Sequence, residues 1–107
     1  MLQNIDRISP LPQEVICFLT SLTTNNVIDR MIVFGSRAIG DYEKYSDLDL
    51  AIDAPKMSKL EWQKLKEYVT YDLRTVLRIS LVYYSTNPPK LKERIKTTGT
   101  IIYGRQS

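Results

Sequence analysis

The chain has 107 residues, of which 43% are hydrophobic and 25% are charged, with a net charge of +3 and no histidine. These proportions predict one globular domain over residues 1–107 and exclude a disordered chain, and the lack of histidine excludes imidazole catalysis, His–Zn sites and Ser–His triads. Because no apolar run approaches the roughly 18 residues that span a membrane and the polar start is no signal peptide, we expect a cytoplasmic protein without a membrane anchor. Any catalysis would rest on carboxylates, a metal ion, hydroxyls, Lys or Arg.

The first predicted element is an amphipathic helix over residues 10–22, which Ser9 and Pro10 would start as cap and first helical residue. Its core-facing stripe is predicted from the helical spacing of Val15, Ile16, Leu19 and Leu22. Cys17 lies on an apolar stretch of the same helix, so we expect a small buried core residue rather than a reactive thiol.

The rest of the chain predicts strands that alternate with helices. Apolar runs predict strands over residues 27–34, 47–52 and 76–84, with a possible edge strand over 100–103. Helices are expected after Ser36, from the capping box Ser58–Glu61 to about Leu73, and after Asn87-Pro88. The expected fold class is α+β with α/β-like layering: a small mixed sheet of three or four strands covered by helices.

The last segment of the chain, residues 88–107, is basic. Its charges sum to +4, from Lys90, Lys92, Arg94, Lys96 and Arg105 against Glu93. Such a segment can contact a nucleotide's phosphates, nucleic acid or an acidic partner, or it can be a solvated helix face. No aromatic platform accompanies these charges, so direct nucleic-acid binding is not expected.

A candidate site lies between the first two predicted strands. Gly35 and Ser36 form a tight turn into a helix start, whose free N–H groups attract anions. Asp47 and Asp49 are two residues apart on a predicted strand and project from the same face. Paired carboxylates repel each other unless a cation lies between them, and hard cations such as Mg²⁺ prefer oxygen ligands. This pattern predicts a metal site that faces a phosphate-binding turn.

The string FGSRAIGDYEKYSDLDLAI resembles the GS…DxD signature of the DNA polymerase β-like nucleotidyltransferases, with ten residues between Ser36 and Asp47. It looks like the minimal, MNT-type members of that superfamily, and the resemblance covers essentially the whole chain. The resemblance implies a nucleotidyltransferase fold in which Gly35 and Ser36 hold the triphosphate of ATP or another nucleotide. It also implies that Asp47 and Asp49 are catalytic and bind Mg²⁺, while Arg37 is a candidate for a further phosphate contact.

The third predicted strand departs from the family's pattern. Members carry a third carboxylate there, between hydrophobic residues, but Ser80 occupies that position in Ile79-Ser80-Leu81. A serine is uncharged, cannot act as the general base and binds Mg²⁺ weakly, so the two-metal site would be incomplete. Asp53 faces the same way as Asp49, but it lies about 13 Å further along an extended strand and cannot replace the missing carboxylate.

Two functions follow from the resemblance. In the first, the chain is the antitoxin of a toxin–antitoxin pair and an Mg²⁺-dependent enzyme, which transfers NMP, AMP from ATP above all, to a hydroxyl of a HEPN-domain partner. In the second, it is a weak or inactive MNT-fold antitoxin that binds nucleotide and neutralises a HEPN ribonuclease by direct contact. Asp47 and Asp49 favour the first function, and Ser80 favours the second.

Overall fold

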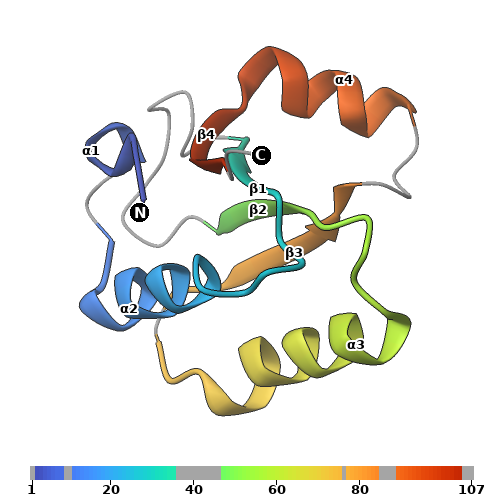
Figure 1. Ribbon diagram of the computed structural model, residues 1–107. Coiled ribbons are helices and arrows are strands. Elements are labelled where there is room, and N and C mark those ends of the chain that lie inside the picture. The colour runs from blue at the N-terminus through green and yellow to red at the C-terminus, as the bar shows by residue number, and fades with distance from the viewer. Residues whose placement is uncertain (1, 9–10, 36–46, 76, 85–88, 105–107) are drawn as a thin grey trace.

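The computed structural model describes residues 2–8, 11–35, 47–75, 77–84 and 89–104 (Figure 1). In chain order the elements are α1 (Ile5–Ile8), α2 (Gln13–Leu22), β1 (Arg30–Phe34), β2 (Leu48–Asp53), α3 (Lys59–Glu67), a π-helical turn η1 (Tyr68–Asp72), β3 (Ile79–Tyr83), α4 (Pro89–Thr98) and β4 (Thr100–Gly104). In these parts of the chain, no helix is long and apolar enough to cross a membrane.

The four strands form one mixed sheet in the order β3-β2-β1-β4. β1 is antiparallel to both β2 and β4, whereas β2 and β3 are parallel. This arrangement confirms the predicted mixed sheet, including an edge strand near the C-terminus. β3 forms the opposite edge.

Helices cover both faces of the sheet, with α2 and α3 on one side and α4 on the other (Figure 1). Successive strand residues point to opposite faces, so β1 contributes to two separate cores. Val33 packs in the larger cluster with Leu19 of α2, while Ile32 packs in a smaller cluster with Ile95 of α4 and Ala51 of β2. The centre of β1 is therefore buried on both faces, as its continuous apolar run predicts.

Helix α2 differs from its prediction in both its start and its buried face. It begins at Gln13, because Pro12 disfavours the helical conformation in the residue before it. The predicted start at Ser9 and Pro10 lies outside the described residues. Phe18 is buried together with the predicted Val15, Leu19 and Leu22, whereas Ile16 is half-buried. Cys17 is exposed, so its predicted burial was wrong, because the apolar stripe of α2 is centred one residue away.

Two strands are shorter than predicted because a polar side chain holds a turn before each of them. The Asn25 side chain accepts a hydrogen bond from the backbone N–H of Val27 at 3.1 Å, so β1 begins at Arg30 rather than at residue 27. Likewise, the Thr75 hydroxyl accepts from the N–H of Leu77 at 3.2 Å, and β3 begins only at Ile79. Local side-chain bonds of this kind compete with strand pairing.

The capping box before α3 is confirmed. The Ser58 hydroxyl accepts from the backbone N–H of Glu61 at 3.1 Å and lies 3.2 Å from the Glu61 carboxylate. Helix α3 then runs into η1, which ends at Asp72, close to the predicted end near Leu73.

Helix α4 packs closely on the sheet because a glycine follows it. Gly99 donates its N–H to the Ile95 carbonyl at 2.7 Å, and a Cβ on Gly99 would lie 2.7 Å from Cγ2 of Ile32 in β1. The Ile95 side chain is only 2% exposed, so it fixes α4 above β1 and β2.

We expect Ile95→Ala to lower the free energy of unfolding by about 2–5 kcal/mol, the usual cost of truncating a buried isoleucine. Urea unfolding measures this loss. The matched control is Lys96→Ala, an exposed change on the same helix, which should stay within about 0.5 kcal/mol of the parent protein. Equal effects of the two variants would contradict the anchoring role of Ile95.

Candidate active site

The candidate site forms where β1 ends beside the start of β2. Phe34, the last residue of β1, is paired with Asp49 of β2, and Gly35 follows directly. Gly35 has a φ of +77°, a left-handed conformation that residues with a Cβ rarely adopt. The chain therefore leaves the sheet through a glycine-dependent turn beside the Asp49 carboxylate.

The contact between Gly35 and Asp49 leaves no room for a larger residue. A Cβ built on Gly35 would overlap Oδ2 of Asp49 and would lie 3.4 Å from its Cγ. The same Cβ would lie 3.7 Å from Nη2 of Arg94. Glycine is needed here for two reasons, because its backbone is left-handed and because the Asp49 carboxylate occupies the side-chain space.

Two carboxylates, those of Asp47 and Asp49, lie at the start of β2. Asp47 is exposed just before the strand, and Asp49 is half-buried within it. Burial raises the pKa of the Asp49 carboxyl, the positive charge of Arg94 lowers it, and the negative charge of Asp47 raises it. The two carboxylates therefore affect each other electrostatically, as their spacing predicts.

The donor set suits a hard divalent cation. Asp47 and Asp49 offer carboxylate oxygens, and a cation between them would relieve their repulsion. Within the residues that the structure describes, no group of three or more His, Cys, Asp or Glu side chains could hold a metal ion.

Ser80 lies directly beside Asp49. The parallel register of β2 and β3 pairs these two residues, so their side chains share a sheet face. The structure therefore brings Ser80 to the carboxylate pair, at the position where the family that the sequence resembles carries a third acid.

Asp53, at the other end of β2, is engaged elsewhere. Its Oδ2 accepts a hydrogen bond from Nε of Arg30 at 2.8 Å, and the Asp53 side chain is only 16% exposed. The Arg30 guanidinium also lies 5.2 Å from the centroid of the Tyr84 ring. The Asp53 carboxylate is thus paired with Arg30 at the end of β2 away from Asp49.

Arg94 is the site residue that no motif identifies. It precedes the buried Ile95 on α4, and its guanidinium carbon lies 5.9 Å from the centroid of the Phe34 ring. Lys92 of the same helix lies 5.6 Å from the centroid of the Tyr84 ring. The basic segment is therefore not only a solvated face, because these two cations lie over the rings of Phe34 in β1 and of Tyr84 just after β3. The charges are evident in the sequence, but which of them faces the site depends on how α4 packs on the sheet.

Ser36 and Arg37, the other predicted phosphate contacts, lie outside the described residues. Their roles remain predictions. So does the predicted short helix after Ser36.

Comparisons with known proteins give consistent results. A family model described as polymerase beta, nucleotidyltransferase matches residues 19–107. The "Putative protein adenylyltransferase MJ0141" of Methanocaldococcus jannaschii is 38% identical over 73 residues, which cover 66% of this chain and 67% of that protein.

Solved structures share the fold. A toxin–antitoxin crystal structure with AMP-PNP matches with a TM-score of 0.62 at 22% identity, over 87% of this chain and 73% of the matched chain. A chain from the complex of tri-AMPylated Shewanella oneidensis HEPN toxin with MNT antitoxin matches with a TM-score of 0.55 at 20% identity, over 87% and 71%. These likenesses confirm the predicted nucleotidyltransferase fold.

We expect Gly35→Ala to lower the free energy of unfolding by about 1–2 kcal/mol from left-handed strain alone, with a further loss from the overlap with Asp49. Gly104→Ala is the matched control, since a Cβ on Gly104 would meet nothing within 4 Å. Urea unfolding of both variants measures the difference. A Gly35→Ala protein as stable as Gly104→Ala would show that the turn is not formed as described.

We expect Asp49→Asn to raise the unfolding midpoint of the metal-free protein at neutral pH. A raised pKa means that the folded chain holds this proton more tightly than the unfolded chain, so stability falls as pH rises above about 3.9. The amide avoids that loss, so the advantage of the variant should grow as pH rises from about 4 and level off above the pKa of Asp49 in the folded protein.

Thermal melts with and without Mg²⁺ measure this effect. Mg²⁺ should raise the midpoint of the parent protein more than that of Asp49→Asn. The control is Asp53→Asn, which breaks the ion pair with Arg30 and should lower the midpoint. A lower midpoint for Asp49→Asn would contradict the electrostatic description of the site.

Proposed function

This chain belongs to the polymerase β family of nucleotidyltransferases, and we propose that it is the Mg²⁺-dependent antitoxin of a toxin–antitoxin pair, transferring AMP from ATP to a hydroxyl of a HEPN-domain partner. The observation that carries the proposal is the Asp49 carboxylate, which lies against the Gly35 turn and two residues from Asp47. The adenylyltransferase name of the Methanocaldococcus protein and the AMPylated HEPN toxin in the Shewanella complex support the choice of AMP and of partner.

In this proposal Asp47 and Asp49 hold Mg²⁺ together with the phosphates of ATP. The bound metal would offset negative charge on the phosphates as pyrophosphate leaves. Gly35 allows the backbone to approach a phosphate closely, because no Cβ stands in the way. Ser36 and Arg37 are expected to add phosphate contacts from the turn that follows.

Among the described residues, Arg94 is a suitable cation for binding the phosphates. Its guanidinium already lies beside the Gly35 turn and near Asp49. Guanidinium groups bind phosphate oxygens through two parallel hydrogen bonds, which a flexible ammonium group does not reproduce. Arg94 would therefore hold the triphosphate on the α4 side of the sheet.

The transfer forms a bond between the acceptor oxygen and the α-phosphorus, and it breaks the bond from that phosphorus to the leaving pyrophosphate. The acceptor hydroxyl must also lose its proton. Ser80 cannot take that proton at neutral pH, so the factor of about 10²–10⁴ that a general base contributes would be reduced or lost. We therefore expect slow transfer.

Ser80 also supports a second candidate function. A site with two carboxylates and a serine in register with Asp49 suits a protein that binds nucleotide and neutralises a HEPN ribonuclease by contact alone. The two candidates differ in whether neutralisation needs the carboxylates.

The test measures transfer of labelled AMP from ATP in Mg²⁺ to the HEPN-domain chain that the proposal requires as partner. We expect slow labelling by the parent protein and an increase of about 10²-fold or more with Ser80→Asp, which supplies the missing base. Gln13→Asp is the matched control, because it adds the same charge at an exposed position in the first turn of α2, where an acidic residue is favourable.

Two outcomes separate the candidate functions. The enzyme proposal fails if neither the parent protein nor Ser80→Asp labels the partner. The contact function fails if Asp47→Ala with Asp49→Ala leaves the complex intact but abolishes neutralisation of the toxin.

A further inference from the structure

We propose that an extended segment of the acceptor protein binds along the open edge of β3 as an added strand, which brings its hydroxyl to the site at Asp47 and Asp49. This inference rests on the proposed transfer and specifies how the acceptor is recognised. Three observations support it: an edge of β3 that no described strand covers, a trough that reaches β3 at two places, and the spacing between these two places on β3.

The outer edge of β3 has backbone groups available for pairing. The Leu48 N–H donates to the Arg78 carbonyl at 2.9 Å, so in this parallel pair the alternate residues Arg78, Ser80 and Val82 direct their backbone groups toward β2. Ile79, Leu81 and Tyr83 therefore direct theirs outward. In the part of the chain that the structure describes, no strand pairs with this side of β3.

The opposite edge of the sheet, at β4, is partly covered by the N-terminal segment. At β4, the Gln3 N–H donates to the Ile102 carbonyl at 2.8 Å, and the Asn4 side chain donates to the Ile101 carbonyl at 2.9 Å. The N-terminal segment thus covers part of that edge. Proteins usually protect free strand edges, so an uncovered one is a candidate site for adding a strand.

A trough made of three depressions that share lining residues runs along α3 and η1 and reaches β3 at both of its ends. The first has a volume of about 540 Å³ and is lined by Asp47, Ser80 and Thr70, among others. Thr70 also lines the second, again of about 540 Å³, along α3 and η1. Trp62 lines the second and the third, which has a volume of about 380 Å³ and reaches Tyr83. The trough therefore reaches β3 at Ile79 and Ser80 and again at Tyr83, and it follows α3 and η1 between these two places.

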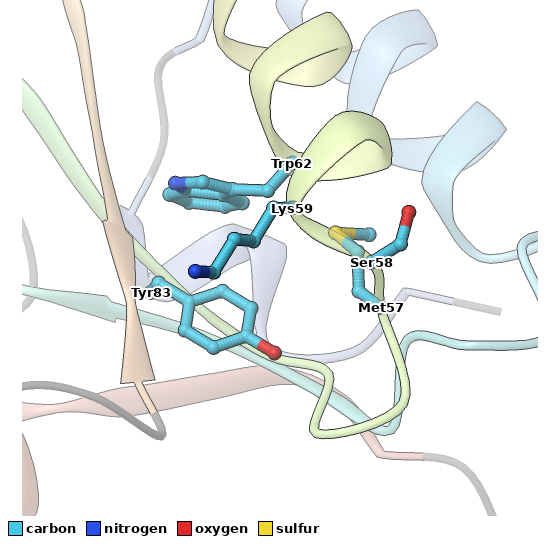
Figure 2. A pocket seen from close by; sticks show the side chains of 5 residues that line it. All are labelled: Met57, Ser58, Lys59, Trp62 and Tyr83. Carbon is cyan, nitrogen blue, oxygen red and sulfur yellow. The ribbon is translucent and has the colours of Figure 1, made fainter.

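The far end of the trough is a mostly apolar pocket (Figure 2). Figure 2 shows the side chains of Trp62, Lys59 and Tyr83 on one side and those of Met57 and Ser58 on the other. The rings of Trp62 and Tyr83 meet edge to face, with centroids 5.1 Å apart. The Tyr83 hydroxyl donates to the Ala54 carbonyl at 2.6 Å, which holds the ring in place. Such a rigid pocket suits an apolar or aromatic anchor.

The two ends of the trough define a spacing in the bound segment. Ser80 and Tyr83 are three residues apart on β3, about 10 Å at strand rise, and their side chains lie on opposite sheet faces. A strand added alongside β3 has the same alternation. The acceptor hydroxyl, next to Ser80, and an anchor residue in the Trp62 pocket should therefore be three residues apart.

The α3 side of the trough has the character of a protein-binding surface. Helix α3 has no fully buried residue, and the Tyr71 side chain, which lines the trough on η1, is 80% exposed. Exposed aromatic side chains are typical of surfaces that bind proteins. Lys66 and Glu67 both line the trough, and such mixed charge fits a polypeptide better than a nucleic acid.

The test uses the complete chain and short fluorescent peptides of Thr and Val that contain one Tyr and one Leu. In the reference peptide, the Tyr and the Leu are three positions apart. In the second, of the same composition, they are four apart, so that the Leu points to the wrong face. The third is the reference peptide with methyl groups on every second backbone nitrogen, which removes those N–H donors. It is made in two versions, one methylated at the odd positions and one at the even positions.

Fluorescence polarisation should show binding of the reference peptide, at least about 5-fold weaker binding of the shifted peptide, and at least about 10-fold weaker binding of one methylated version. Trp62→Ala should weaken binding of the reference peptide by about 10-fold. Leu60→Ala is the matched control, because Leu60 is 64% exposed on the same helix but lines none of the three depressions.

The inference is overturned if the reference peptide does not bind, or if all of the peptides bind alike. It is also overturned if sedimentation shows that a second copy of the chain occupies the β3 edge. Calorimetry of Mg²⁺-ATP binding on the same samples keeps the two proposals apart. ATP binding without peptide binding contradicts the added strand alone, and peptide binding without ATP binding contradicts the proposed enzyme alone.

Discussion

The contact between the Asp49 carboxylate and the Gly35 backbone is the constraint on which the rest of the site depends. A Cβ at Gly35 would occupy the place of Oδ2, so the turn after β1 and the carboxylate of β2 must form together. Pairing of Phe34 with Asp49 sets this contact, because it aligns the end of one strand with the start of the next. The same register leaves Asp49 partly buried and near Asp47, and both effects raise the pKa of its carboxyl.

The two faces of the sheet differ in the side chains that they carry. The face toward α2 and α3 holds the larger hydrophobic core, whereas the α4 face holds a small cluster around Ile95. Because that cluster is small, the α4 face has space for charged groups. The Asp49 carboxylate and Ser80 point to it, and Arg94 of α4 lies over it. Because strand side chains alternate between the two faces, the larger hydrophobic core and the candidate site lie on opposite faces of the sheet.

The general arrangement of the fold and the carboxylate pair could be predicted from sequence, because both depend on local periodicity. The period of two places Asp47 and Asp49 on one face whatever their neighbours are. The positions of Arg94 and Ser80 depend on tertiary pairing, and only the family pattern suggested a role for Ser80 in advance. Cys17 was predicted on the wrong side of α2 because the helix is apolar over more than one face. The starts of β1 and β3 were misjudged because the side chains of Asn25 and Thr75 hold turns within apolar runs.

We propose that a divalent metal binds with ATP at Asp47 and Asp49, beside Gly35. Paramagnetic broadening of backbone amide signals by a small fraction of Mn²⁺, in excess Mg²⁺-ATP, tests this proposal. We expect the amides of Gly35, Asp49 and Ser80 to broaden first, and that of Asp53, about 13 Å along β2 from Asp49, to broaden later. Broadening centred at Asp53, or no broadening in the presence of ATP, would overturn the proposed metal site.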